Sequence, residues 1–93
     1  MSENQRQHPR KEIRFEVRLG YMKDPLRTVI TRDISHGGIF MFLDNPDHYN
    51  LGEMLTLEYL DPLENGAQTH KDAVIVRHTD EGIGAAFIDM EDF

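Results

Sequence analysis

Two short groups of polar residues carry side chains suited to a planar, anionic ligand. The first is Arg6-Gln7-His8-Pro9-Arg10, and the second is Asp33-Ile34-Ser35-His36-Gly37-Gly38. An arginine guanidinium is a planar fork of donors that fits a phosphate or the paired O6 and N7 acceptors of guanine. An ionised aspartate only accepts, so it fits the N1–H and N2–H₂ donor edge of guanine.

The remaining polar and small residues of the second group support the same chemistry. The Ser35 hydroxyl can donate to one partner and accept from another. Gly37 and Gly38 are expected to let the backbone approach a flat ligand closely and to adopt positive φ. Together the two groups match the donors and acceptors of a negatively charged guanine nucleotide.

The distribution of charge points the same way. The net charge of the 93-residue chain is −7, which argues against general affinity for nucleic acids. Residues 1–32 nevertheless hold eight basic and four acidic side chains, whereas residues 33–93 hold two basic and thirteen acidic ones. Basic residues concentrated in one segment of an acidic protein favour a local anion site there, and the alternative is a solvated basic strand that binds nothing.

Short apolar runs with a period of two indicate the elements that must position these groups. Residues 1–12 carry almost no apolar side chain and are expected to form a flexible arm. The alternation from Ile13 to Leu19 predicts a half-buried strand, and that from Met54 to Leu60 predicts another with Leu55, Leu57 and Tyr59 on one face. The other strands are expected around Val29–Ile30 and at 39–43, 68–78 and 83–88, with turn residues between them.

Six short strands and no helical pattern predict an all-β fold, a small six-stranded antiparallel β-barrel whose closure leaves no exposed edge. The expected organisation is a ligand-binding arm over residues 1–12 and a barrel domain over residues 13–93. The chain has no cysteine, which excludes disulfides, thiolate catalysis and cysteine-ligated metals. Its polar N-terminus and the lack of a long apolar stretch predict a cytoplasmic protein without membrane insertion.

These motifs resemble those of the PilZ domain, the bacterial receptor module for cyclic di-GMP. The RxxxR motif of that family falls on Arg6 and Arg10, and its D/N-x-S-x-x-G motif falls on Asp33, Ser35 and Gly38. The segments Val74-Ile75-Val76-Arg77 and Gly82-Ile83-Gly84-Ala85-Ala86-Phe87 are similar to the closing hairpin of the family. PilZ domains often continue into a C-terminal helix, which is not expected here because the sequence stops soon after the last strand.

The resemblance implies a role for each matched residue. Arg6 and Arg10 would hold the phosphates and guanine edges of cyclic di-GMP, and Asp33 would bind a guanine Watson–Crick edge. Ser35 would add a polar contact, Gly37 and Gly38 would permit close approach, and Arg77 matches a basic position on a neighbouring strand. It further implies a receptor rather than an enzyme, with no cofactor besides the nucleotide ligand. On binding, the arm would fold onto the barrel and present a changed surface to an effector protein.

Three other functions can be weighed on particular residues. Arginines recurring every four residues from Arg6 to Arg18 would form a basic, nucleic-acid-binding stripe on a helix, but Pro9 and the strand periodicity oppose a helix there. Asp33, Ser35 and His36 are too close along one strand end for a nucleophile–base–orienter arrangement.

A metal site is the third alternative, built from His70, Asp72 and His78 on one face of a regular strand. The two histidines would then lie about 26 Å apart, too far to share an ion. A PilZ-like module that binds a protein partner but no nucleotide also stays open, because a fold does not by itself establish a function. The downstream pathway, the ligand stoichiometry and the oligomeric state are not fixed by the sequence.

Overall fold

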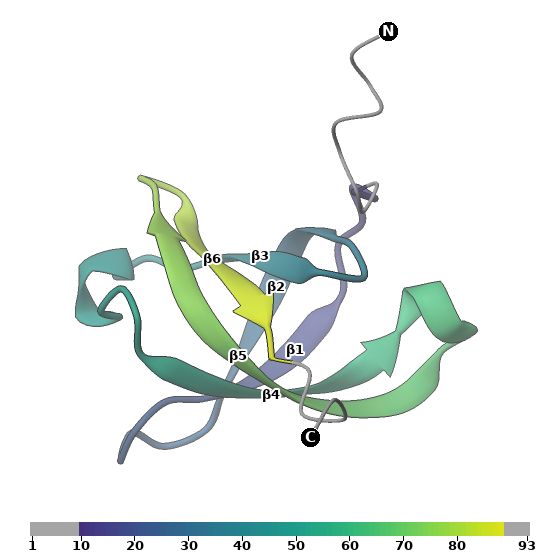
Figure 1. Ribbon diagram of the computed structural model, residues 1–93, viewed down its shortest axis with the longest axis horizontal. Coiled ribbons are helices and arrows are strands. Elements are labelled where there is room, and N and C mark those ends of the chain that lie inside the picture. Colours follow the sequence, from purple (N-terminus) through teal and green to yellow (C-terminus); the bar gives the residue numbers. More distant parts are fainter. Residues whose placement is uncertain (1–9, 89–93) are drawn as a thin grey trace, which may run out of the picture.

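The computed structural model describes residues 10–88, and strands account for most of its regular secondary structure (Figure 1). The predicted arm lies outside these residues except for positions 10–12, and so does the C-terminal stretch where no helix is expected. Six strands follow one another along the chain: β1 (Glu16–Gly20), β2 (Arg27–Ile34), β3 (Gly38–Phe42), β4 (Met54–Asp61), β5 (Ala67–His78) and β6 (Gly82–Phe87). Two 3₁₀ turns, η2 (Pro46–His48) and η3 (Pro62–Glu64), interrupt the loops.

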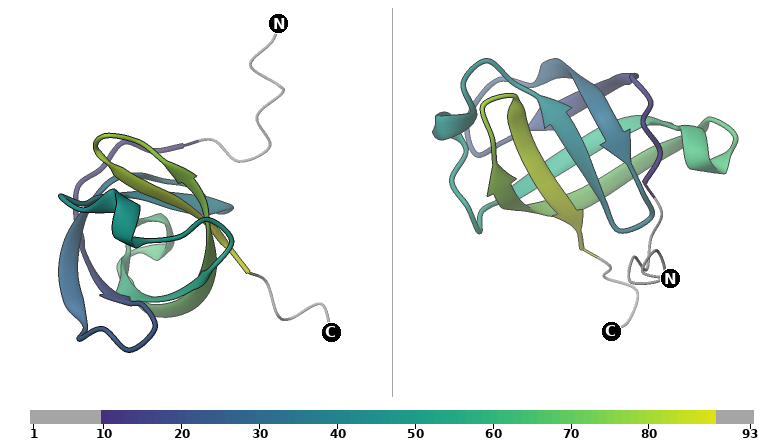
Figure 2. Two further views of the ribbon diagram at one scale, coloured as in Figure 1. Left: turned by 90° about the vertical axis from the view of Figure 1, so that its left-hand side faces the viewer. Right: turned by 90° about the horizontal axis from the view of Figure 1, so that it is seen from above.

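The strands form one closed antiparallel barrel in the order β1-β2-β3-β6-β5-β4, which confirms the predicted fold class. Figure 2 shows the barrel along its axis and from the side. Every neighbouring pair is antiparallel, including β1 with β4, which closes the sheet. Among residues 10–88 no helix has the length and hydropathy needed to cross a membrane.

The barrel interior is filled by the alternating apolar residues that the period of two predicts. Leu55, Leu57 and Tyr59 of β4 are all buried in the core, as expected from their spacing. Ile39 and Met41 of β3 join them from across the barrel. One face of each of these strands therefore fills the core, and the other face remains available on the outside.

The first strand is shorter than the alternation predicts. It begins at Glu16 rather than Ile13, because the Thr31 side chain takes up two backbone groups of the preceding segment that a regular ladder would pair. The Thr31 hydroxyl of β2 accepts from the Phe15 N–H at 3.1 Å and donates to the Ile13 carbonyl at 2.6 Å. Two backbone contacts also join this segment to β2: the Thr31 N–H donates to the Phe15 carbonyl at 3.0 Å, and Lys11 forms an isolated bridge with Ile34.

Two β-bulges change the alternation of the outer face. The register shifts between Thr31 and Asp33 in β2, and again between Ile75 and Arg77 in β5. On a regular strand Asp33 would face inward like Thr31, because side chains two residues apart share a face. Because of the extra residue, Asp33 faces outward, and it pairs with the outward-facing Phe40 of β3. The bulge in β5 turns Arg77 outward in the same way, where it pairs with Gly84.

Candidate functional site

The two bulges produce a row of paired residues across four strands of the outer face. Asp33 of β2 pairs with Phe40 of β3, Phe40 pairs with Gly84 of β6, and Gly84 pairs with Arg77 of β5. Directly paired residues of antiparallel strands point to the same face. An acceptor and a cation thus lie at opposite ends of the row, roughly 14 Å apart at a spacing of about 4.8 Å per strand. Arg77, expected on a neighbouring strand, is three strands from Asp33.

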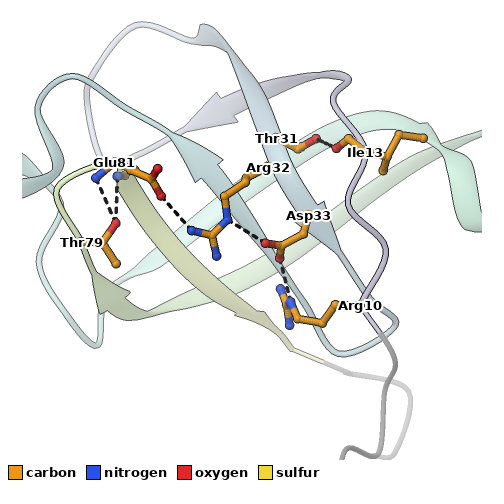
Figure 3. Close-up of polar contacts among 8 residues, drawn as sticks. Arg10, Ile13, Thr31, Arg32, Asp33, Thr79 and Glu81 are labelled. Carbon is orange, nitrogen blue, oxygen red and sulfur yellow. Dashed lines mark hydrogen bonds and ion pairs between the residues drawn. The ribbon is translucent and has the colours of Figure 1, made fainter.

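Asp33 is the most buried charged group of this site, with 7% of its side chain exposed. Arg10 donates from Nε to Oδ1 at 2.7 Å, and Arg32 donates from Nε to Oδ2 at 2.9 Å (Figure 3). Burial alone raises the pKa of Asp33, but the hydrogen bonds from Arg32 and Arg10 outweigh it and lower the pKa below its ordinary value of 3.8. Asp33 is therefore an ionised acceptor at neutral pH.

Arg10 reaches Asp33 because the backbone next to it is fixed to β2. Lys11 N–H donates to the Ile34 carbonyl at 2.8 Å, and Ile34 N–H donates back to the Lys11 carbonyl at 3.0 Å. The second arginine of the RxxxR motif therefore lies against the aspartate of the other motif. Arg6 lies outside the described residues.

Phe40 occupies the middle of the row and is 1% exposed although it faces outward. Two guanidinium groups cover its ring: the Arg32 Cζ lies 4.0 Å from the ring centroid and the Arg77 Cζ lies 5.7 Å from it. Such cation–π contacts hold each arginine flat against the barrel. Both arginines border the outer cavity, Arg32 next to Asp33 and Arg77 at the other end of the row.

Ser35 and the two glycines form the turn between β2 and β3. The Ser35 Oγ accepts from the Gly37 N–H at 3.1 Å, and the Ser35 N–H donates to the Gly38 carbonyl at 2.9 Å. The expectation of positive φ at Gly37 and Gly38 is wrong, since the described glycines with positive φ are Gly52 and Gly66. Gly38 instead permits a close strand contact: a Cβ there would lie 2.6 Å from the Ala85 carbonyl oxygen.

These residues border one open cavity on the outside of the barrel, of about 780 Å³. Its lining includes every predicted site residue that the structure describes, and it also includes Arg32, Phe40 and Gly84. Its predicted members are Arg10, Asp33, Ser35, Gly37, Gly38 and Arg77. Small residues of β3 and β6, among them Gly38, Gly84 and Ala86, form part of its lining.

Sequence reasoning missed three contributors. Arg32 lies in neither motif, yet it touches Asp33, the Phe40 ring and Glu81, whose Oε1 it contacts at 2.9 Å. Phe40 belongs to the apolar run at 39–43, and because every residue of that run is apolar, the sequence does not indicate which of them face outward. Glu81 lies in the turn before β6 and is brought close only by barrel closure. The adjacent Arg32-Asp33 pair was visible in the sequence, but its shared face depends on the bulge.

The described residues contain no group of three histidine, aspartate or glutamate side chains placed to hold a metal ion. The arrangement assumed for His70, Asp72 and His78 is wrong because β5 is not regular. His78 pairs with the core residue Ile83 after the bulge and faces inward, whereas His70 pairs with the outer residue Glu58.

A closed six-stranded barrel with an aspartate, a serine and arginines around an outer cavity defines a small ligand-binding domain. The sequence profile of the PilZ domain family matches residues 4–92, and the chain belongs to this family. Members bind cyclic di-GMP, act as receptor domains rather than enzymes, and often interact with effector proteins. A search of the curated proteins returned no match to this chain.

Proposed function

We propose that this protein is a receptor for cyclic di-GMP that closes its N-terminal segment over the bound nucleotide. One observation carries the proposal: Asp33, at the edge of the cavity, is held by Arg10 from the N-terminal segment. The two family motifs are thus already in contact across 23 residues of sequence, at 2.7 Å. A nucleotide placed at Asp33 would lie within reach of the RxxxR segment.

The proposed roles follow from donor and acceptor chemistry. Asp33 would accept from N1–H and N2–H₂ of one guanine, and Ser35 would add a hydroxyl contact. The Asp33 Oδ1 is occupied by Arg10, so binding would transfer Arg10 from the aspartate to the O6 and N7 atoms of guanine or to a phosphate. Arg6 would hold the second position of the motif, and Arg77 would meet the far part of the ligand.

The proposed output is a change in the N-terminal segment while the barrel keeps its shape. The barrel strands are hydrogen-bonded on both sides, whereas the described end of the N-terminal segment joins β2 through the Lys11–Ile34 bridge. Ordering a residue costs about 1–2 kcal/mol, and charge-assisted hydrogen bonds of about 1.5–3 kcal/mol each would offset this. The rearranged segment would then be read by an effector protein.

Titration calorimetry with cyclic di-GMP tests nucleotide binding. Wild type is expected to bind, and Asp33→Ala, Arg10→Ala and Arg6→Ala are each expected to weaken binding by at least about tenfold. Arg18→Ala is the matched control, because Arg18 pairs with Glu58 on β4 outside the cavity. Cyclic di-AMP is the ligand control, since adenine presents an N1 acceptor to Asp33. Absence of heat with wild type would overturn the proposal and leave the interaction-module alternative.

The rearrangement is tested separately by amide NMR of residues 2–12. Cyclic di-GMP is expected to shift these resonances and to reduce their fast motion, while amides of β4 change little. An N-terminal segment with the same dynamics in both states would refute the rearrangement without refuting binding.

A further inference from the structure

We infer that Arg32 is a positioning residue that fixes the orientation and ionised state of Asp33 for guanine recognition. The inference rests on the proposed function and adds to it a residue outside both family motifs. Arg32 does not need to touch the ligand for this role. It acts through the carboxylate that does.

The first support is the geometry of the bulge in β2. Neighbours on a regular strand point to opposite faces, so Arg32 and Asp33 could not meet there. The register shift between Thr31 and Asp33 makes Arg32 the extra residue. Its Nε then lies 2.9 Å from Asp33 Oδ2, and both side chains border the same cavity.

The second support is that Arg32 is held on three sides. It donates to Asp33, and it donates from a terminal nitrogen to Glu81 at 2.9 Å (Figure 3). Its guanidinium Cζ also lies 4.0 Å from the centroid of the Phe40 ring. Glu81 is itself anchored, because its N–H donates to the Thr79 hydroxyl at 3.0 Å. Losing one partner would therefore leave Arg32 in place.

The third support is the contrast with Arg10 on the other carboxylate oxygen. Arg10 makes one ion pair among the described residues, to Asp33, whereas Arg32 makes two and also lies on an aromatic ring. When guanine approaches Asp33, Arg10 is the partner that can leave at lower cost. Arg32 would stay and keep the carboxylate plane aimed into the cavity. Arginine is suited to this task because its fork can bind two carboxylates while its face stacks.

Arg32 also contributes to the charge of Asp33. The charged groups facing this carboxylate are Arg10 and Arg32 directly, with Glu12 and Arg77 around the same cavity and Glu81 behind Arg32. Hydrogen bonding to Arg32 is the largest influence that lowers the pKa of Asp33. A protonated Asp33 would lose acceptor capacity for the guanine edge. As the pH is lowered, a variant without Arg32 should therefore lose nucleotide binding at a higher pH than wild type does.

Three variants separate the charge of Arg32 from its shape. Arg32→Met keeps an unbranched cover over Phe40 but removes charge and donors. Arg32→Lys keeps the charge but cannot bridge Asp33 and Glu81 as a planar fork. Glu81→Gln leaves the Asp33 contact and loosens the far end. Arg18→Ala is again the control, and thermal unfolding verifies that each variant is folded.

The experiment is cyclic di-GMP calorimetry from pH 7 downward, with carbon-13 NMR titration of the Asp33 carboxyl in the free protein. For Arg32→Met we expect at least about tenfold weaker binding at pH 7, and midpoints of affinity loss and carboxyl titration at higher pH than in wild type. Compared with Arg32→Met, Arg32→Lys is expected to bring the midpoint of the Asp33 titration closer to the wild-type value, because the charge is kept. It is expected to restore the affinity for cyclic di-GMP less, because the planar fork is lost. Glu81→Gln should change the affinity and the midpoint far less than Arg32→Met does, because Arg32 keeps its contacts with Asp33 and Phe40.

The inference is overturned if Arg32→Met binds as tightly as wild type, or if its Asp33 titrates at the wild-type midpoint. The carboxyl titration needs no nucleotide, so it distinguishes this failure from failure of the proposed function. A wild type that binds no cyclic di-GMP, with an Asp33 midpoint that Arg32→Met raises, would refute the receptor function alone. If wild type binds cyclic di-GMP but Arg32→Met leaves the midpoint of the Asp33 titration unchanged, only the inference about Arg32 is refuted.

Discussion

At the scale of single residues, the site depends on which side chains share the outer face with Asp33. The carboxylate supplies the acceptor, Arg10 and Arg32 keep it ionised, and Phe40 gives two guanidiniums a surface on which to lie. The motif glycines have a different task from the one their sequence suggests. Gly38 allows β3 to approach the backbone of β6, so its absence would disturb the barrel before it disturbed a ligand.

Gly38 and Gly84 therefore make a matched pair for mutagenesis. A Cβ at Gly38 would lie 2.6 Å from the Ala85 carbonyl oxygen, whereas one at Gly84 meets its nearest neighbour at 3.5 Å. Gly38→Ala is expected to lower the free energy of unfolding by about 1–3 kcal/mol, because backbone must move. Gly84→Ala should change it by less than about 1 kcal/mol. Urea unfolding of both variants measures this, and equal stabilities would contradict the assigned contact.

At the scale of elements, periodicity predicted the strands well and their irregularities not at all. Residues 54–60 and 68–78 were expected as strands and are observed as Met54–Asp61 and Ala67–His78. The same alternation fails where a bulge adds a residue, because one extra position reverses every later side chain. Asp33 was therefore recognisable by its motif, but its contact with Arg32 was not.

Thr31 is the side chain that joins the N-terminal segment to the barrel. Its buried hydroxyl bonds to the Phe15 N–H and to the Ile13 carbonyl, just before the regular pairing of β1 begins. Thr31→Val keeps the shape but leaves an N–H and a carbonyl without that partner. We expect a loss of about 1–3 kcal/mol in the free energy of unfolding.

Urea unfolding checks this prediction, with two comparison variants. Thr31→Ser retains the hydroxyl and should recover most of the stability. Thr28→Val lies on the exposed face of the same strand and should have little effect. A Thr31→Val protein as stable as wild type would show that the hydroxyl does not hold this segment.

At the scale of the whole molecule, closure of the barrel gathers cations in a protein whose net charge is −7. Arg10, Arg32 and Arg77 come from the N-terminal segment, β2 and β5, yet they border one cavity. Acidic side chains dominate the rest of the sequence after residue 32. The cations are therefore gathered at one cavity rather than spread over an extended basic surface, as the proposed binding of a small anion requires.

This distribution predicts selectivity between a cyclic dinucleotide and a nucleic-acid polymer. A compact dianion can occupy the cavity, whereas a duplex that follows the surface meets net negative charge and lacks the row of phosphate contacts that drives polymer binding. At about 0.15 M salt, duplex DNA is expected to bind more weakly than about 10⁻⁴ M. Fluorescence anisotropy with labelled duplex and with labelled cyclic di-GMP measures both affinities under one condition. DNA binding of micromolar strength would contradict this account. Weakening of such binding by Arg18→Ala would locate a polyanion surface outside the cavity, because Arg18 pairs with Glu58 there.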